Sequence, residues 1–124
     1  MSVTSAYQMK NGRVYIGAVE LWDALKPLET PFFFYNLDHV EERAKLLKNA
    51  LTKAAGLPTA IHYAMKANAN PSVLKLLKAC GLEVDVVSGG EIDCARLNGF
   101  TSEDILFSGV AKTVKELRQA IDLG

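Results

Sequence analysis

The sequence predicts an α/β fold in which helices cover a parallel sheet. From Thr30 onward, strand and helix signals alternate and give four successive β/α units. The joints between the units are short and rich in Gly, Pro, Asn and Ser, which is typical of tight turns. Such alternation implies parallel strands joined by right-handed crossovers. With 49% hydrophobic residues, the 124-residue chain can build one core.

The first unit is expected to begin with a strand at residues 32–35, a continuous aromatic run typical of a strand buried on both faces. Asp38, with Glu41 three residues later, predicts the start of a helix. The apolar stripe of this helix has helical spacing and consists of Val40, Ala44, Leu47, Leu51 and Ala54. Gly56 and Pro58 are expected to end the helix.

The second unit has an expected strand at residues 60–66 and a helix that opens at Pro71, which is tolerated in a first helical turn. Asn68 and Asn70 are interpreted as turn and N-cap residues rather than ligands. The apolar face of the helix consists of Val73, Leu74, Leu77 and Cys80. Gly81 is expected to end it.

The third unit has an expected strand at residues 83–87 and a helix that runs through Leu97 to Gly99. The string SGGE at residues 88–91 joins them and predicts a tight turn. Binding of a phosphate by its N–H groups is the weaker alternative.

The fourth unit has an expected strand at residues 104–107, then Gly109 and an exposed Lys112. Thr113 and Glu116 form a capping box at the start of the last helix. The residues of this helix expected to face the core are Leu117, Ala120 and Ile121.

The first 29 residues differ in character from the rest. Residues 14–16 read as a strand and residues 19–25 as a short amphipathic helix. This segment is either an extra edge element of the sheet or part of another domain.

Composition excludes several classes of function. The 14 Lys and Arg residues balance the 14 Asp and Glu residues, so we expect no nucleic-acid partner and no membrane association. Cys80 and Cys94 form no CxxC motif and only two histidines occur, so we expect no metal site and two reduced thiols. The N-terminus lacks the pattern of a signal peptide, and we therefore expect a cytoplasmic protein.

Lys66 is the strongest candidate for chemistry, because it ends a buried strand at the face where α/β proteins place their active sites. Burial of such an amine would favour its neutral, nucleophilic form. By strand alternation Ala64 and His62 face the same side as Lys66. The small Ala64 leaves room there for a flat ring, and His62 is expected to be a hydrogen-bonded interior residue. Asp85 interrupts an apolar strand and needs a cation as partner, for which Lys66 is the obvious candidate.

The architecture has two alternatives at this point. A self-sufficient chain of this length fits a flavodoxin-like sheet of four or five units. An eight-fold barrel needs about 250 residues, so only half of it would be present.

Several strings, in order along the chain, resemble those of the fold type III, alanine-racemase-like decarboxylases that use pyridoxal phosphate, and most of all those of their diaminopimelate branch. The strings are VYIGAV at 14–19, TPFFFYN at 30–36, HYAMKANANP at 62–71, VDVVSGGE at 84–91 and ILFSGVAK at 105–112. The resemblance implies that residues 30–124 are the first four β/α units of a (β/α)8 TIM-like barrel. Residues 1–29 would then be a short N-terminal lead-in from the family's β-domain.

The resemblance also implies a chemistry. Lys66 would form the internal aldimine with pyridoxal 5′-phosphate, with Asp85 and Ala64 beside the cofactor. The implied reaction is decarboxylation of meso-diaminopimelate to L-lysine, in which the cofactor takes up the electrons released as carbon dioxide leaves. Ornithine, arginine and carboxynorspermidine decarboxylases share the scaffold and are alternatives. The implied partners are an amino-acid substrate and either the remainder of the decarboxylase or a second copy in a homodimer.

Several functional groups of that family have no counterpart within these 124 residues. They are the phosphate loop, the acid that faces the pyridine nitrogen, the substrate-binding arginine and the cysteine of the C-terminal domain. We therefore expect the chain to be inactive alone and to act as the N-terminal portion of a decarboxylase. The alternative is a non-catalytic half-barrel that pairs with itself or with a complete enzyme through exposed strand edges.

Overall fold

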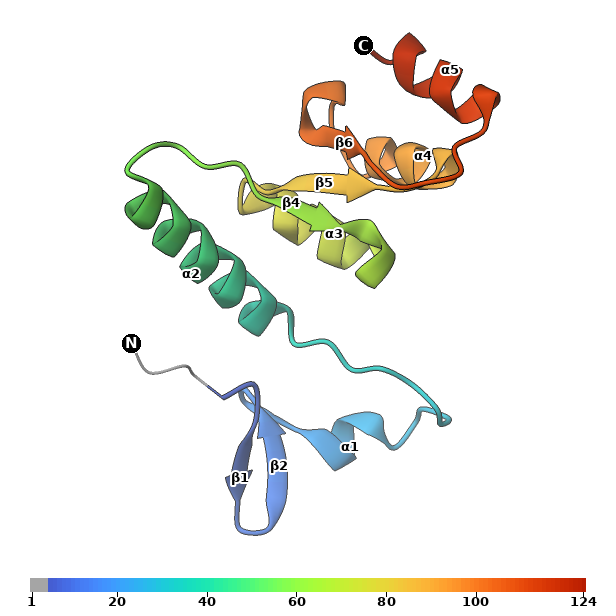
Figure 1. The fold of residues 1–124 in the computed structure, drawn as a ribbon. Coiled ribbons are helices and arrows are strands. Elements are labelled where there is room, and N and C mark those ends of the chain that lie inside the picture. The colour runs from blue at the N-terminus through green and yellow to red at the C-terminus, as the bar shows by residue number, and fades with distance from the viewer. Residues whose placement is uncertain (1–4) are drawn as a thin grey trace. The chain divides into compact units, whose positions relative to one another are not determined.

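The computed structural model describes residues 5–124, which fall into two compact units divided between His39 and Val40. Figure 1 shows a small antiparallel sheet in the first unit and a parallel sheet with helices in the second. The expected domain boundary between residues 29 and 30 stays a prediction.

The first unit is a three-stranded antiparallel sheet, in the order β1-β2-β3, followed by a short helix. Its elements are β1 (Gln8–Lys10), β2 (Arg13–Ile16), β3 (Val19–Glu20) and α1 (Leu21–Leu25). The strand expected at residues 14–16 is confirmed. The helix expected at residues 19–25 begins two residues later, because Val19 and Glu20 pair with β2.

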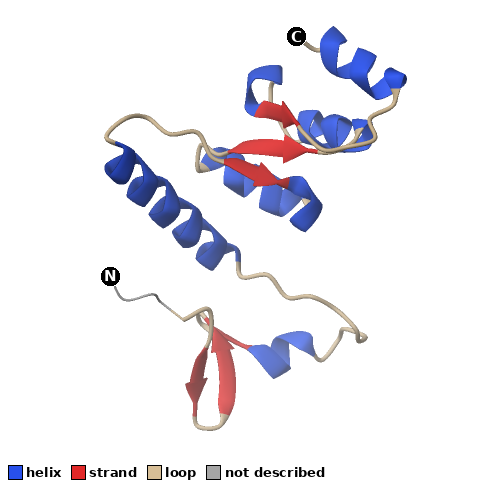
Figure 2. Cartoon of the chain, in the orientation of Figure 1, coloured by secondary structure: helices blue, strands red, loops and turns tan. Residues whose placement is uncertain are grey.

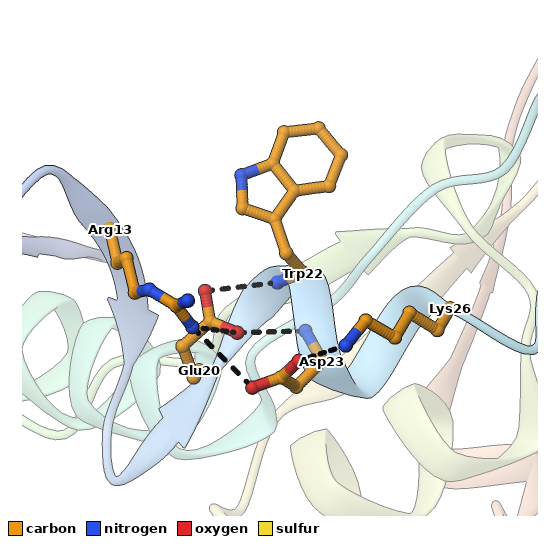
Figure 3. Close-up of polar contacts among 5 residues, drawn as sticks. All are labelled: Arg13, Glu20, Trp22, Asp23 and Lys26. Carbon is orange, nitrogen blue, oxygen red and sulfur yellow. Dashed lines mark hydrogen bonds and ion pairs between the residues drawn. The ribbon is translucent and has the colours of Figure 1, made fainter.

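A polar network fixes the start of α1, as Figure 3 shows. The Glu20 carboxylate accepts hydrogen bonds from the backbone N–H groups of Trp22, at 3.4 Å, and Asp23, at 2.8 Å. Arg13 Nη1 lies 3.8 Å from Glu20 and 3.6 Å from Asp23. The Lys26 ammonium lies 2.6 Å from Asp23. The N-terminal N–H groups of this short helix are thus satisfied by a side chain, and the network ties the helix to β2.

Residues 32–35 form no strand, which corrects the sequence prediction. They belong to neither sheet of the described chain. Their side chains are exposed, from 38% for Phe32 to 90% for Phe33. Aromatic side chains favour a strand only where a neighbouring strand offers ladder hydrogen bonds and a surface to pack against. The run has neither here, so its β propensity has no effect.

The second unit contains a parallel three-stranded sheet in the order β4-β5-β6 (Figures 1 and 2). Its strands are β4 (His62–Ala64), β5 (Glu83–Val86) and β6 (Ile105–Phe107). The helices are α2 (Leu37–Ala55), which begins in the last residues of the first unit, α3 (Pro71–Ala79), α4 (Gly89–Leu97) and α5 (Val114–Asp122). Two 3₁₀ turns complete it, η1 (Met65–Ala67) and η2 (Ser102–Asp104). The predicted α/β alternation with parallel strands is therefore confirmed from residue 60 onward.

The core of the second unit lies between the sheet and helices α3 and α4. Val84 and Val86 of β5 are fully buried on this side. They belong to a cluster that consists of Met65, Leu74, Val84, Val86, Ile92, Ala95 and Phe100. Because side chains alternate along a strand, Glu83 and Asp85 point to the other face of the sheet.

Helix α2 departs from its prediction in two respects. The carboxamide of Asn36 accepts a hydrogen bond from His39 N at 3.2 Å, so Asn36 rather than Asp38 satisfies the start of the helix. Of the predicted apolar stripe only Ala44 is buried, whereas Leu47 and Leu51 are 49% and 39% exposed. Helical spacing defines a face, but burial requires an element packed along its whole length.

In helix α5, as in α2, only part of the predicted apolar face is buried. The capping box of Thr113 and Glu116 is confirmed. Ala120 packs against the core as expected. Leu117 and Ile121 do not, being 43% and 75% exposed. The core touches only the side of the helix that carries Ala120, so two of the three predicted core positions are wrong.

Candidate active site

Lys66 is the middle residue of the 3₁₀ turn η1, directly after β4 at the carboxyl end of the sheet. The predicted strand at residues 60–66 is thus shorter, because the chain turns after Ala64. The turn is closed by the Tyr63 hydroxyl, which donates to Asn68 O at 3.2 Å, and by Met65, which is fully buried. The side chain of Lys66 is exposed, so the described residues do not bury its amine as the sequence argument expected.

Asn68 and Asn70 fix the path from Lys66 into the next helix. Asn68 Oδ1 accepts from Asn70 N at 2.9 Å, and Asn70 Oδ1 accepts from Ser72 N at 2.9 Å. Pro71 is the first residue of α3, as predicted. Both asparagines therefore have the predicted turn and N-cap roles. The lysine is consequently held between a strand and a capped helix.

Asp85 lies on β5 in register with Ala64 of β4 and Leu106 of β6. Its Oδ1 atom is buried and has no hydrogen-bond partner among the residues that the structure describes. The predicted ion pair with Lys66 is not formed, because Lys66 has left the strand for η1 and its side chain is exposed. A buried acceptor without a donor costs about 1–3 kcal/mol. This oxygen is therefore open to a donor from outside the described residues.

His62 and Glu83 form the next pair down the same face, in register on β4 and β5. His62 Nε2 and Glu83 Oε2 lie 2.8 Å apart. His62 is therefore hydrogen-bonded, as expected, but it is exposed rather than interior in the described chain, which corrects that part of the prediction. It lies at the opposite end of the strand from Lys66 and satisfies Glu83 rather than Asp85.

The SGGE turn after β5 is occupied by two carboxylates of the chain itself. Glu91 Oε2 accepts from Val87 N at 2.7 Å, and Glu116 Oε1 accepts from Gly89 N at 3.0 Å. The bond from Gly89 N, followed by those from Thr113, lowers the pKa of the Glu116 carboxyl from 4.5 to about 2. A phosphate would have to displace this carboxylate, so the structure supports the tight-turn interpretation. Nothing in the sequence pattern indicated the contact of Glu116 with Gly89.

The loop after β6 also differs from its prediction. Lys112 was expected to be exposed, but it is half-buried. Its ammonium donates to Gly109 O and lies 4.9 Å from the centre of the Phe107 ring. Contact with an aromatic face and a carbonyl oxygen stabilises a cation at this depth.

The thiols and other potential ligands remain separate. Cys80 and Cys94 are unpaired and half-buried. Within residues 5–124 no three His, Cys, Asp or Glu side chains are grouped to hold a metal ion. None of the helices in that range is long and apolar enough to cross a membrane.

The residues at the carboxyl end of β4 and β5 fit a cofactor that carries an aldehyde. Lys66 supplies an accessible primary amine from a backbone position held in η1, and such an amine adds to carbonyl groups. Asp85 supplies a carboxylate oxygen that lacks a donor. Ala64, in register with Asp85, presents only a methyl group at its position on that face.

Comparison with known proteins gives the same chemistry. Residues 37–124 match the family model described as "Pyridoxal-dependent decarboxylase, pyridoxal binding domain". Diaminopimelate decarboxylase of Aquifex aeolicus is 36% identical over 115 residues, which are 93% of this chain and 26% of that protein. The chain thus spans about a quarter of the length of the curated relatives it matches.

Solved structures agree with the sequence comparison. Diaminopimelate decarboxylase from M. jannaschii in complex with L-lysine matches with a TM-score of 0.82 and 28% identity, over 99% of this chain and 29% of that one. Lysine decarboxylase from Selenomonas ruminantium matches with a TM-score of 0.74 and 29% identity, over 90% and 29%. The fold class predicted from the sequence, β/α units of the N-terminal half of a TIM-like barrel, is confirmed by these similarities.

Proposed function

We propose, from the premise that this chain belongs to the family of pyridoxal-dependent decarboxylases, that it carries the cofactor lysine of a meso-diaminopimelate decarboxylase. The family's cofactor is pyridoxal phosphate. The complete protein would convert meso-diaminopimelate to L-lysine in the cytoplasm. The remainder of the protein would supply the phosphate-binding and substrate-binding groups. Residues 1–29 would belong to its β-domain and residues 30–124 to its barrel.

The observation that supports this proposal is that Lys66 follows the end of β4 while Asp85, on the neighbouring strand β5, has a buried oxygen without a donor. The lysine leaves β4 at the carboxyl end of the sheet, and the Asp85 oxygen is buried on the neighbouring strand without a donor. Pyridoxal phosphate, when bound, supplies an electron sink for the carbon that loses carbon dioxide.

Each of the three residues has a distinct role in the proposal. The Lys66 amine would hold the cofactor, and its Nζ atom would hold or deliver a proton during the reaction. Asp85 has a buried carboxylate oxygen that receives no hydrogen bond from the described chain, so it would accept one from the bound cofactor. Ala64 would leave room for the cofactor ring beside Asp85, since any larger side chain there would project from the same register position.

We infer the proposed substrate from the enzymes to which this chain is similar. Among eight of the most similar relatives, seven are named diaminopimelate decarboxylase, and the eighth is named L-glutamyl-[BtrI acyl-carrier protein] decarboxylase. The solved lysine decarboxylase shows that a similar fold serves another amino acid. Lysine is therefore a competing substrate, and ornithine, arginine and carboxynorspermidine are the others that the family resemblance implies. A homodimer is the proposed assembly.

The test uses the full-length protein that contains this chain. Lys66→Ala should abolish both the visible absorbance of bound cofactor and the release of carbon dioxide from meso-diaminopimelate. Lys75→Ala is the matched control, because Lys75 is an exposed lysine on α3, nine residues further on, and both properties should persist. Activity on one of the competing substrates but not on meso-diaminopimelate would correct the substrate. Retention of the absorbance in Lys66→Ala would overturn the assignment of the lysine.

A further inference from the structure

The two turns at the carboxyl end of the sheet are joined to each other. Ser108 N donates to Val86 O at 2.9 Å, which extends the pairing of β6 with β5 by one residue. Gly109 then passes directly over Val87: a Cβ atom at Gly109 would lie 3.2 Å from Val87 Cβ, and the φ angle of Gly109 is +89°. Both the close approach and the left-handed backbone require glycine here.

Glu116 of α5 completes this connection. Its Oε2 atom accepts from Thr113 N at 2.9 Å and from Thr113 Oγ1 at 2.7 Å, which closes the capping box of its own helix. Its Oε1 atom accepts from Gly89 N, 27 residues away in the sequence, at 3.0 Å. One carboxylate therefore caps α5 and binds the first residue of α4.

Gly89 is enclosed from two sides. Gln119 Nε2 donates to Gly89 O at 3.2 Å and to Asp93 Oδ1 at 2.7 Å. A Cβ atom at Gly89 would lie only 2.5 Å from Gln119 Oε1. The backbone of Gly89 is thus bound at its N–H by Glu116 and at its carbonyl by Gln119. Its position is set by α5 rather than by α4 alone.

The charge of Glu116 suits this place. The N-terminus of a helix attracts a negative charge, because its N–H groups lack partners and the helix dipole is positive there. The hydrogen bonds from Gly89 and Thr113 hold the pKa of Glu116 at about 2, so the carboxylate is ionised at neutral pH. It occupies the position that an anionic ligand would take in a phosphate-binding turn.

The backbone bound in this way leads directly to Asp85. Val86 O accepts from Ser108 N, Val87 N donates to Glu91, and Gly89 N donates to Glu116. Asp85 is the residue immediately before this fixed segment. We propose that Glu116 is a positioning residue for the cofactor site: by fixing the β5–α4 turn, it holds the Asp85 carboxylate in the place where it meets the group bound at Lys66. This inference rests on the proposed function above.

The test compares three variants of the full-length protein. Glu116→Ala removes the carboxylate, and Glu116→Gln keeps the shape and one acceptor oxygen while removing the charge. Glu103→Gln is the control, because Glu103 is exposed and makes no hydrogen bond or ion pair with the described residues. Three properties are measured: amide hydrogen exchange of Gly89 in the cofactor-free protein, the Kd for pyridoxal phosphate, and the pH midpoint of the visible absorbance of the bound form.

The expected result is faster Gly89 exchange in Glu116→Ala, with a Kd raised about tenfold and a shifted pH midpoint. In metal sites, mutation of a residue that orients a ligand lowers affinity by about 10- to 100-fold, and we expect the lower value here. Glu116→Gln should lie between Glu116→Ala and the unchanged protein, and it carries the test if Glu116→Ala does not fold.

Two outcomes would overturn the inference. The first is faster Gly89 exchange with an unchanged Kd and pH midpoint, which would make Glu116 purely structural. The second is unchanged Gly89 exchange. Failure of the proposed function is recognised separately, because the Lys66→Ala variant would then keep its cofactor absorbance. That result does not depend on the results of the Glu116 variants.

Discussion

Asp85→Val should change stability and cofactor affinity in opposite directions. In the structure Asp85 Oδ1 is buried without a donor, and the flanking residues of β5 are Val84 and Val86, both fully buried. An unpaired buried acceptor costs about 1–3 kcal/mol, and valine removes that cost while suiting a strand. The cofactor-free protein should therefore become more stable by about 1–3 kcal/mol. A charge-assisted hydrogen bond is worth a similar amount, so cofactor affinity should fall about tenfold or more.

The assay is urea unfolding of the cofactor-free full-length protein, followed by titration with pyridoxal phosphate. With a denaturant slope of about 2 kcal/mol/M, the gain corresponds to a midpoint raised by about 0.5–1.5 M. Glu83→Val is the matched control, since Glu83 lies two residues earlier on the same face of β5 but is paired with His62 at 2.8 Å. That variant should lose up to about 1 kcal/mol, the usual value of a partly exposed pair.

The reasoning fails if Asp85→Val destabilises the cofactor-free protein as Glu83→Val does. Such a result would mean that the Asp85 carboxylate is satisfied in solution. It also fails if Asp85→Val binds pyridoxal phosphate as tightly as the unchanged protein, because the orphaned oxygen would then have no role in the site.

Two further predictions concern the scaffold. The hydrogen bond from Lys78, at 2.8 Å, and those from Thr101 lower the pKa of Asp104 from 3.8 to about 2. The contribution of the Asp104 carboxylate to the free energy of unfolding is therefore complete above pH 3.8 and is lost as the pH falls through about 2. Asp104→Asn should therefore lower the free energy of unfolding in urea by about 1–2 kcal/mol at pH 7. The difference between the variant and the unchanged protein should vanish as the pH falls through about 2. A constant difference across this pH range would refute the pairing of Asp104 with Lys78. Ile92→Ala should lower the free energy of unfolding by about 2–5 kcal/mol, because Ile92 is 1% exposed. Leu97→Ala on the same helix should change it by less than about 0.5 kcal/mol, because Leu97 is 85% exposed. Equal losses of the two variants in thermal unfolding would contradict the assigned core.

Local signals in the sequence were sufficient for the helix of the second β/α unit. The start of α3 at Pro71, its cap at Asn70 and its buried face depend on residues within a few positions of one another. Helix caps and spacing are properties of the local chain, so a single sequence contains them. The same holds for the capping box of Thr113 and Glu116.

Errors arose where an element depends on a distant neighbour. Residues 32–35 have strand-forming side chains but no pairing strand in the described chain. Ile121 has the correct helical position but no element packed over it. Spacing determines which side chains share a face, whereas burial depends on what covers that face.

The candidate site was identified from the sequence only in part. Lys66 and Asp85 do lie at adjacent strand ends, but the expected ion pair is absent because β4 ends at Ala64 and the lysine enters a 3₁₀ turn. The contact of Glu116 with Gly89 spans 27 residues and left no pattern in the sequence. Contacts of this kind between two turns become visible only once the helices are packed.

The central claim is that Lys66 is the residue that binds the cofactor, and one measurement tests it most directly. The full-length protein is loaded with pyridoxal phosphate, reduced with borohydride, digested, and the peptides are mapped by mass spectrometry. We expect the pyridoxyl mass on the peptide that contains Lys66 and on no other lysine peptide. A modification at another lysine, or none in a protein that is active, would contradict it.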